Sequence, residues 1–145
     1  MTSTGLQGFD RSIQKTNIWL NEISEGMEDQ RREMAYHALR GVLFALRDRL
    51  PPYEVFNLSA QVPLIVRGIL FEGYNLNDKP EKYDREEFLT RVRKELQNMG
   101  GANAERATRA VFRVLAIKLD PGEVSDIQRA LPKALNEFWP EEVPK

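Results

Sequence analysis

The sequence of 145 residues contains no cysteine and only one histidine, His37. The chain therefore has no disulfide, no catalytic thiolate and no cysteine-ligated zinc or iron–sulfur centre. This absence fits a reducing compartment, and we expect a cytoplasmic protein. Glu33 precedes His37 by one helical turn, so the two would share a face. A zinc or iron site needs about three protein ligands, so we expect a surface or partly buried histidine and no bound metal.

Excess charge and long apolar runs are also lacking. The formal net charge is −1 and the isoelectric point is near 5.9, which argues against a general polyanion binder, so no nucleic acid is expected as a partner. The longest apolar runs, such as residues 62–66 and 68–71, are far shorter than a membrane span. Residues 1–8 lack the apolar core of a signal peptide. We expect no association with a membrane.

Catalytic signatures are missing as well. The sequence has no Gly-x-Ser-x-Gly elbow, no Gly-x-Gly-x-x-Gly pattern and no phosphate loop. Gly100-Gly101 before a predicted helix is a weak phosphate cue that is better explained as a helix end. The carboxylate pairs Glu86-Glu87 and Glu141-Glu142 are adjacent in sequence, whereas an acid–base pair has to converge on a substrate. We predict no catalytic residue and no cofactor, and we lean against an enzyme.

An internal repeat is what the sequence does have. Residues 34–70 align without a gap to residues 103–139 at a constant offset of 69, and ten of the 37 aligned positions are identical. The identical positions are Ala35, Ala38, Arg40, Val42, Leu46, Leu50, Pro52, Glu54, Val55 and Pro63, each with its counterpart 69 residues later. Most other positions exchange one apolar residue for another. The pattern predicts a duplicated supersecondary unit.

Apolar spacing of three and four residues predicts helices throughout. The first helix is expected over residues 9–24 and ends at Gly26, since glycine tolerates the left-handed backbone beyond a helix. The second is expected over residues 30–49 and is apolar on two sides, which favours an interior helix. Gly41 in its middle costs about 1 kcal/mol of helix propensity. Because its counterpart is Ala110, we expect another helix to pack closely there.

Prolines punctuate both copies. Pro52 and Pro121 are suited to the first turn of a third helix, and Pro63 and Pro132 should break the chain again eleven residues later. Two helix starts have the spacing of a capping box, Asp84 with Glu87 and Asp120 with Glu123.

These observations predict an all-α protein made of two tandem helical repeats, with about four helices each, the last broken by proline. Repeat 1 covers residues 9–73, a polar connector covers residues 74–82, and repeat 2 covers residues 83–140. A unit of this size would be marginal alone. We therefore expect a single domain over residues 1–145 with pseudo-two-fold symmetry around a shared core.

Four stretches resemble a prokaryotic family of uncharacterised proteins, domain of unknown function 2267. They are FDRSIQKTNIWLNEI at 9–23, ALRGVLFALRDRLPPYE at 38–54, AQVPLIVRGILFEGY at 60–74 and RALPKALNEFWP at 129–140. The resemblance implies a duplicated, all-helical fold and brings no activity, substrate or cofactor. Family members often carry tryptophan where Tyr74 stands, so the aromatic character is kept.

A candidate partner or anion surface comes from basic and aromatic residues of repeat 1. Arg47 and Arg67 are replaced by alanine and asparagine in repeat 2, while Tyr74 and Tyr83 flank the polar connector. Arginine with aromatic residues is typical of interface anchors. Ion pairing and core packing are the alternative interpretations of these same residues.

The leading functional hypothesis is a non-enzymatic interaction or regulatory module with an unknown protein partner. The alternative is a small-molecule or anion-binding protein, or an enzyme, with its site between the two repeats. The sequence also leaves a homodimer open.

Overall fold

The computed structural model describes residues 3–100 and 102–142. Within these residues the protein forms eight α-helices and no strand, which confirms the all-α class. The helices are α1 (Gln7–Met27), α2 (Arg32–Arg49), α3 (Pro52–Ser59), α4 (Leu64–Phe71), α5 (Arg85–Leu96), α6 (Ala104–Lys118), α7 (Pro121–Ala130) and α8 (Lys133–Asn136).

Several helix starts follow local sequence chemistry, and one predicted cap does not form. Pro52 and Pro121 each occupy the first turn of their helix. The Asp84 side chain accepts a hydrogen bond of 3.1 Å from the backbone N–H of Glu87, as the capping pattern predicts. The box predicted at Asp120 is wrong, because no side-chain cap bond forms there. The backbone carbonyl of Asp120 instead accepts from the N–H of Glu123 at 2.9 Å.

The helix ends include one correction. Gly26 does not terminate the first helix, since α1 continues to Met27 and Glu28 takes the left-handed conformation with φ 55°. Gly26 instead marks a close approach, because a Cβ there would lie 3.1 Å from the Cβ of Ala110 on α6. Packing against α6 therefore outweighs the tendency of glycine to end a helix.

The long helices α2 and α6 contact each other at the centre of the molecule, and α1 and α5 pack on both of them. The most extensive contacts cross between the halves of the chain, with α1 against α6 and α5 against α2. A Cβ at Gly41 would lie 3.0 Å from the Cβ of Glu95 on α5, which confirms the predicted close helix at that position. Leu46 and Leu115, one on each central helix, are both fully buried.

The core also contains a cluster of three phenylalanine rings. Phe88, Phe112 and Phe138 are fully buried and contact one another with ring centroids 5.7–6.1 Å apart. Elsewhere in the molecule α3 lies against α7. Buried aromatic rings of this size contribute heavily to core stability.

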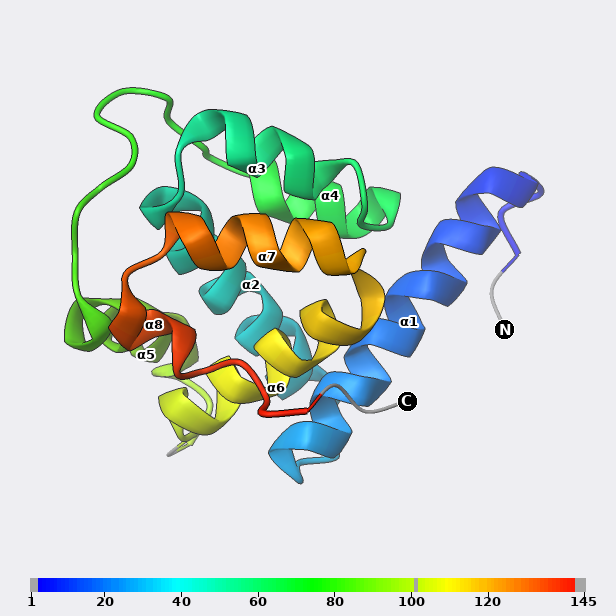
Figure 1. The fold of residues 1–145 in the computed structure, drawn as a ribbon. Helices are drawn as coiled ribbons and strands as arrows, with labels where there is room; N and C mark the ends of the chain where they lie inside the picture. Colours follow the sequence, from blue (N-terminus) through cyan, green and yellow to red (C-terminus); the bar gives the residue numbers. More distant parts are fainter. Residues whose placement is uncertain (1–2, 101, 143–145) are drawn as a thin grey trace.

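Two features extend outward from this body (Figure 1). The N-terminal half of α1 projects beyond the other helices, and the segment between α4 and α5 runs around the outside. None of the helices in the described part of the chain combines the length and apolar character that a bilayer crossing requires.

Candidate functional site

The four residues predicted to form a partner or anion surface lie in two separate places. Arg47, Tyr74 and Tyr83 lie near the C-terminal end of α2, around Asp48. Arg67 lies on α4 and faces the turn between α3 and α4. The structure therefore brings three of the residues together and leaves the fourth in a different surface feature.

Arg47 is buried and acts as a cap for the end of α4. Its guanidinium Nη1 donates hydrogen bonds of 2.7 Å to the carbonyl of Leu70 and 2.6 Å to that of Glu72. Helix C-terminal carbonyls have no partner within their own helix and carry partial negative charge, so a cation stabilises them. The guanidinium also lies 4.2 Å from the ring centroid of Phe44 and 5.5 Å from that of Tyr74. Burial lowers the pKa of Arg47, yet arginine stays charged at any ordinary pH.

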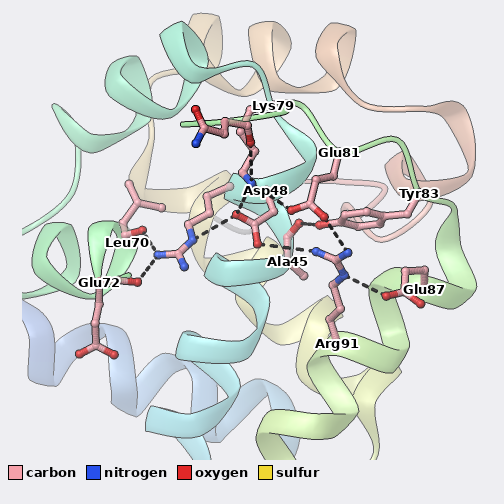
Figure 2. Close-up of polar contacts among 11 residues, drawn as sticks. Ala45, Asp48, Leu70, Glu72, Lys79, Glu81, Tyr83, Glu87 and Arg91 are labelled. Carbon is pink, nitrogen blue, oxygen red and sulfur yellow. Dashed lines mark hydrogen bonds and ion pairs between the residues drawn. The ribbon is translucent and has the colours of Figure 1, made fainter. Parts of the chain in front are cut away.

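Asp48 is the centre of an ion-pair cluster that holds the connector against α2 and α5 (Figure 2). Its carboxylate lies 3.6 Å from Nη1 of Arg91 and 3.9 Å from Nζ of Lys79. Glu81 bridges the same two cations at 3.0 and 3.1 Å. The backbone carbonyl of Asp48 also accepts from the N–H of Glu81 at 2.7 Å.

Tyr83 also contacts this cluster, and its hydroxyl binds α2. Its hydroxyl donates to the backbone carbonyl of Ala45, and the Arg91 guanidinium lies 4.0 Å from the ring centroid. Burial raises the pKa of Tyr83 above its usual range, so the hydroxyl keeps its proton as a donor. The hydrogen bond from Arg91 lowers the pKa of Glu81. The charged groups of the cluster contact one another, and this arrangement holds the connector in place against α2 and α5.

His37 belongs to a second ion-pair group on the α2–α5 surface. Its Nδ1 lies 2.8 Å from Oε2 of Glu95, while Glu33, considered in the sequence as a metal partner, is more distant at 3.7 Å. Arg40 also approaches Glu95, at 3.5 Å. The histidine therefore has a hydrogen-bonding partner on the neighbouring helix, and Arg40 supplies the cation beside the same carboxylate. Gly101 of the weak phosphate cue lies outside the described residues.

A groove of about 570 Å³ separates α1 from the corner between α3 and α4. The N–H of Ile65 in the first turn of α4 donates to the hydroxyl of Ser12 on α1, at 3.2 Å, and ties the two walls together. The groove is lined by Gly8, Arg11, Ser12, Lys15, Ile18, Trp19, Ala60, Gln61, Val62, Pro63, Leu64, Arg67 and Lys118. The lining thus mixes four cationic side chains with apolar ones and includes no carboxylate.

The four cations come from three helices. Arg11 and Lys15 project from one face of α1 and are exposed, with no ion pair inside the described ranges. Arg67 donates through Nε to the carbonyl of Ser59 at 2.8 Å and so holds the α3–α4 turn. Lys118 at the end of α6 pairs with Glu22 at 3.1 Å. Fixed and free cations therefore line the same groove.

A buried carboxylate cluster, which is not among the residues predicted from the sequence, lies between α3 and α7. Glu54 and Glu123 are only 3% and 6% exposed, and they approach each other and Asp126 so that one oxygen of each lies within 4.8 Å of the others. Burial, together with the neighbouring Glu54 carboxyl group, raises the pKa of Glu123. The available signal was the identity of Glu54 and Glu123 at matching repeat positions.

The sequence profile of one protein family, described as "Uncharacterized conserved protein (DUF2267)", matches residues 16–138. The match covers more than half of the chain, and the protein belongs to this family. No curated protein matches the sequence. The family description carries no activity, so the groove and the two clusters have to be interpreted from their own chemistry.

Proposed function

We propose that this member of the DUF2267 family is a non-enzymatic interaction module that binds an acidic, partly apolar segment of a partner protein in the groove between α1 and α4. The observation that carries the proposal is the lining of that groove, which has four cationic side chains and no carboxylate. Charge complementarity of this kind steers association and selects the partner. In a protein of net charge −1, such a local excess of cations is a feature of the groove rather than of the whole chain.

Two exposed apolar side chains in the groove indicate that the partner segment is partly apolar. Ile18 and Leu64 line the groove and are 47% and 55% exposed. Exposed apolar side chains rimmed by charge are characteristic of protein-binding grooves. A helical segment presenting leucine on one face and glutamate beside it would cover both side chains and reach Arg11 and Lys15. The projecting half of α1 gives such a segment a long wall to lie against (Figure 1).

The experiment measures binding of fluorescently labelled synthetic helical peptides by anisotropy. One peptide carries leucine and glutamate, a second replaces glutamate with glutamine, and polyglutamate serves as a purely anionic probe. The charge reversal R11E/K15E alters the exposed groove cations. The matched control R93E/R106E reverses two exposed arginines on α5 and α6 that do not line the groove.

The leucine–glutamate peptide should bind the wild type and lose at least about tenfold in affinity, or about 1.4 kcal/mol, in the groove variant alone. Equal binding of polyglutamate or inorganic phosphate would favour the anion-binding alternative. Tight binding of single-stranded DNA or RNA would contradict the expected absence of nucleic acid. Peptide binding that is insensitive to the groove reversal would refute the proposal.

We also propose that the two halves of the chain descend from one duplicated unit and form a single domain. The halves are residues 9–73 and 83–140, and the connector is residues 74–82. Several features support an approximate two-fold relation. The matching positions Gly41 and Ala110 each lie at a close approach to a helix of the other half. The matching helices α3 and α7 contact each other. A crystal structure in which the two halves superpose should pair α2 with α6 and α3 with α7, and any other pairing would contradict the duplication.

Of the four residues predicted from the sequence to form a partner surface, Arg67 lines the proposed groove. The roles of Arg47, Tyr74 and Tyr83 in partner binding stay predictions. The cytoplasmic location and the homodimer also stay predictions. Fractionation of cells tests the first. Light scattering over a range of concentrations tests the second, since a strict monomer at the highest concentration would contradict it.

A further inference from the structure

We infer that Glu54, Glu123 and Asp126 form a binding site for a divalent cation of the oxygen-preferring class, with Ca²⁺ as its representative. The site lies between α3 and α7, on a different pair of helices from the α1–α4 groove wall. Nothing in the family description assigns it.

The geometry brings ligand atoms from two helices to one point. One oxygen from each of the three carboxylates lies within 4.8 Å of the other two. Oxygens that bind Ca²⁺ lie about 2.3–2.6 Å from the ion, so two ligands on opposite sides of it are about 5 Å apart. The three oxygens can therefore contact a single Ca²⁺ with only small rotations of their side chains. Carboxylates are the ligands that hard divalent cations prefer.

A second observation points to a ligand at this place. Oε2 of Glu54 and Oε2 of Glu123 are both shielded from solvent and have no hydrogen-bond partner in the described part of the chain. A buried carboxylate oxygen without a partner is costly, and more so when another carboxylate faces it. A single divalent cation would satisfy both oxygens and neutralise the mutual repulsion.

Access and the remaining coordination come from a neighbouring cavity. This cavity of about 310 Å³ reaches Glu54 and Asp126 and is also lined by Asn57, whose amide oxygen is a further ligand of the preferred type. Water entering from this side would complete the shell. Arg129 pairs with one oxygen of Asp126, and because its side chain is 72% exposed it is free to move aside when an ion binds.

A cation held in this way would join α3 to α7. Glu123 belongs to the first turn of α7 and Glu54 to the first turn of α3, so the ion would connect two helices that are far apart in sequence. A ligand that binds only the folded state raises its stability in proportion to the logarithm of ligand concentration. Cation binding would therefore be visible as a shift in the unfolding temperature.

The test begins with full-length protein freed of metal by EDTA and dialysis. Ca²⁺, Mg²⁺ and Mn²⁺ are then titrated separately, and binding is followed by calorimetry and by thermal unfolding. E54Q/E123Q removes two ligand charges while keeping the volume, so the variant is expected to fold. D120N is the matched control, because it removes one exposed charge at the start of α7 from a side chain that makes no cap bond.

One equivalent of Ca²⁺ should bind the wild type and D120N with similar affinity and raise their unfolding temperatures. The affinity should fall by at least about tenfold in E54Q/E123Q. Equal Ca²⁺ binding by E54Q/E123Q and the wild type would overturn the assignment. So would a wild type that binds none of the three cations, and in that case a proton shared between the two glutamates is the reason that the pair is tolerated.

Discussion

The close approach of α2 and α5 gives a sharp test of how this fold is packed. A Cβ added at Gly41 would lie 3.0 Å from the Cβ of Glu95 and 3.5 Å from the Cα of Val92. Gly68 on α4 offers the same substitution without this neighbour, because a Cβ there meets no atom within 4 Å. Comparing Gly41→Ala with Gly68→Ala thus separates helix propensity from interhelical contact.

The expected magnitudes follow from these distances. Gly68→Ala should raise the free energy of unfolding by about 1 kcal/mol, the gain in helix propensity at an interior position. Gly41→Ala has the same gain, but its methyl group lies well inside the normal carbon–carbon separation of about 3.5–4.0 Å. Overpacking of this kind costs about 1–3 kcal/mol. We expect a net loss of about 1 kcal/mol, so the two variants should differ by about 2 kcal/mol.

Thermal unfolding followed by circular dichroism, together with urea titration, measures this difference. About 2 kcal/mol corresponds to about 6 °C in unfolding temperature for a domain of this length. Gly26→Ala, whose Cβ would lie 3.1 Å from that of Ala110, should behave like Gly41→Ala. If Gly41→Ala stabilises the protein as much as Gly68→Ala, α5 yields to the added methyl group and the reasoning is refuted.

Two further substitutions, each with a control variant, and one pH series with Glu81→Gln test the Asp48 region. Arg47→Ala leaves the carbonyls of Leu70 and Glu72 without their donor, and it should lower the free energy of unfolding by about 3 kcal/mol. Arg93→Ala at an exposed position should stay within about 0.5 kcal/mol of the wild type in the same urea titration. A similar effect of both would show that Arg47 is not a structural cap. Tyr83→Phe removes the hydrogen bond to Ala45 and should cost about 1 kcal/mol. Tyr53→Phe, at a side chain 66% exposed, should have no measurable effect on the unfolding temperature. An unchanged Tyr83→Phe variant would contradict the assigned bond. The Arg91 hydrogen bond holds the pKa of Glu81 below its ordinary value of 4.5. The stabilisation from this pair is therefore complete above that pH and is lost as pH falls through the lower, folded-state pKa. Urea midpoints at a series of pH values between about 6 and 3 should fall less steeply in Glu81→Gln than in the wild type. Parallel curves would rule out the pair as a source of acid sensitivity.

The all-α class and most helix starts could be predicted from the sequence because they depend on short-range chemistry. Proline in the first turn and the Asp84 cap are properties of a few neighbouring residues. The prediction that Gly26 ends the first helix is wrong because the role of this glycine is set by Ala110, far along the chain. A glycine that ends a helix and a glycine that admits another helix look alike in a single sequence.

The candidate sites depend still more on distant residues. The groove takes cations from α1, α4 and α6, and no local pattern connects Arg11 with Lys118. The charge on Arg47 suggests a surface residue, whereas its burial depends on the two carbonyls at the end of α4. The α3–α7 cluster could be predicted in part from the sequence, since Glu54 and Glu123 are identical residues at aligned positions. Only the structure shows that their helices contact each other.

The crossed packing of α1 on α6 and α5 on α2 has a consequence during synthesis. When α1 leaves the ribosome, the helix that will cover it begins only at Ala104 and has yet to be translated. The apolar face of α1, which includes Trp19 and Ile23, must therefore stay exposed to solvent or pack temporarily against α2 until α6 is made. A nascent chain arrested before α6 should recruit chaperones that the released protein no longer binds.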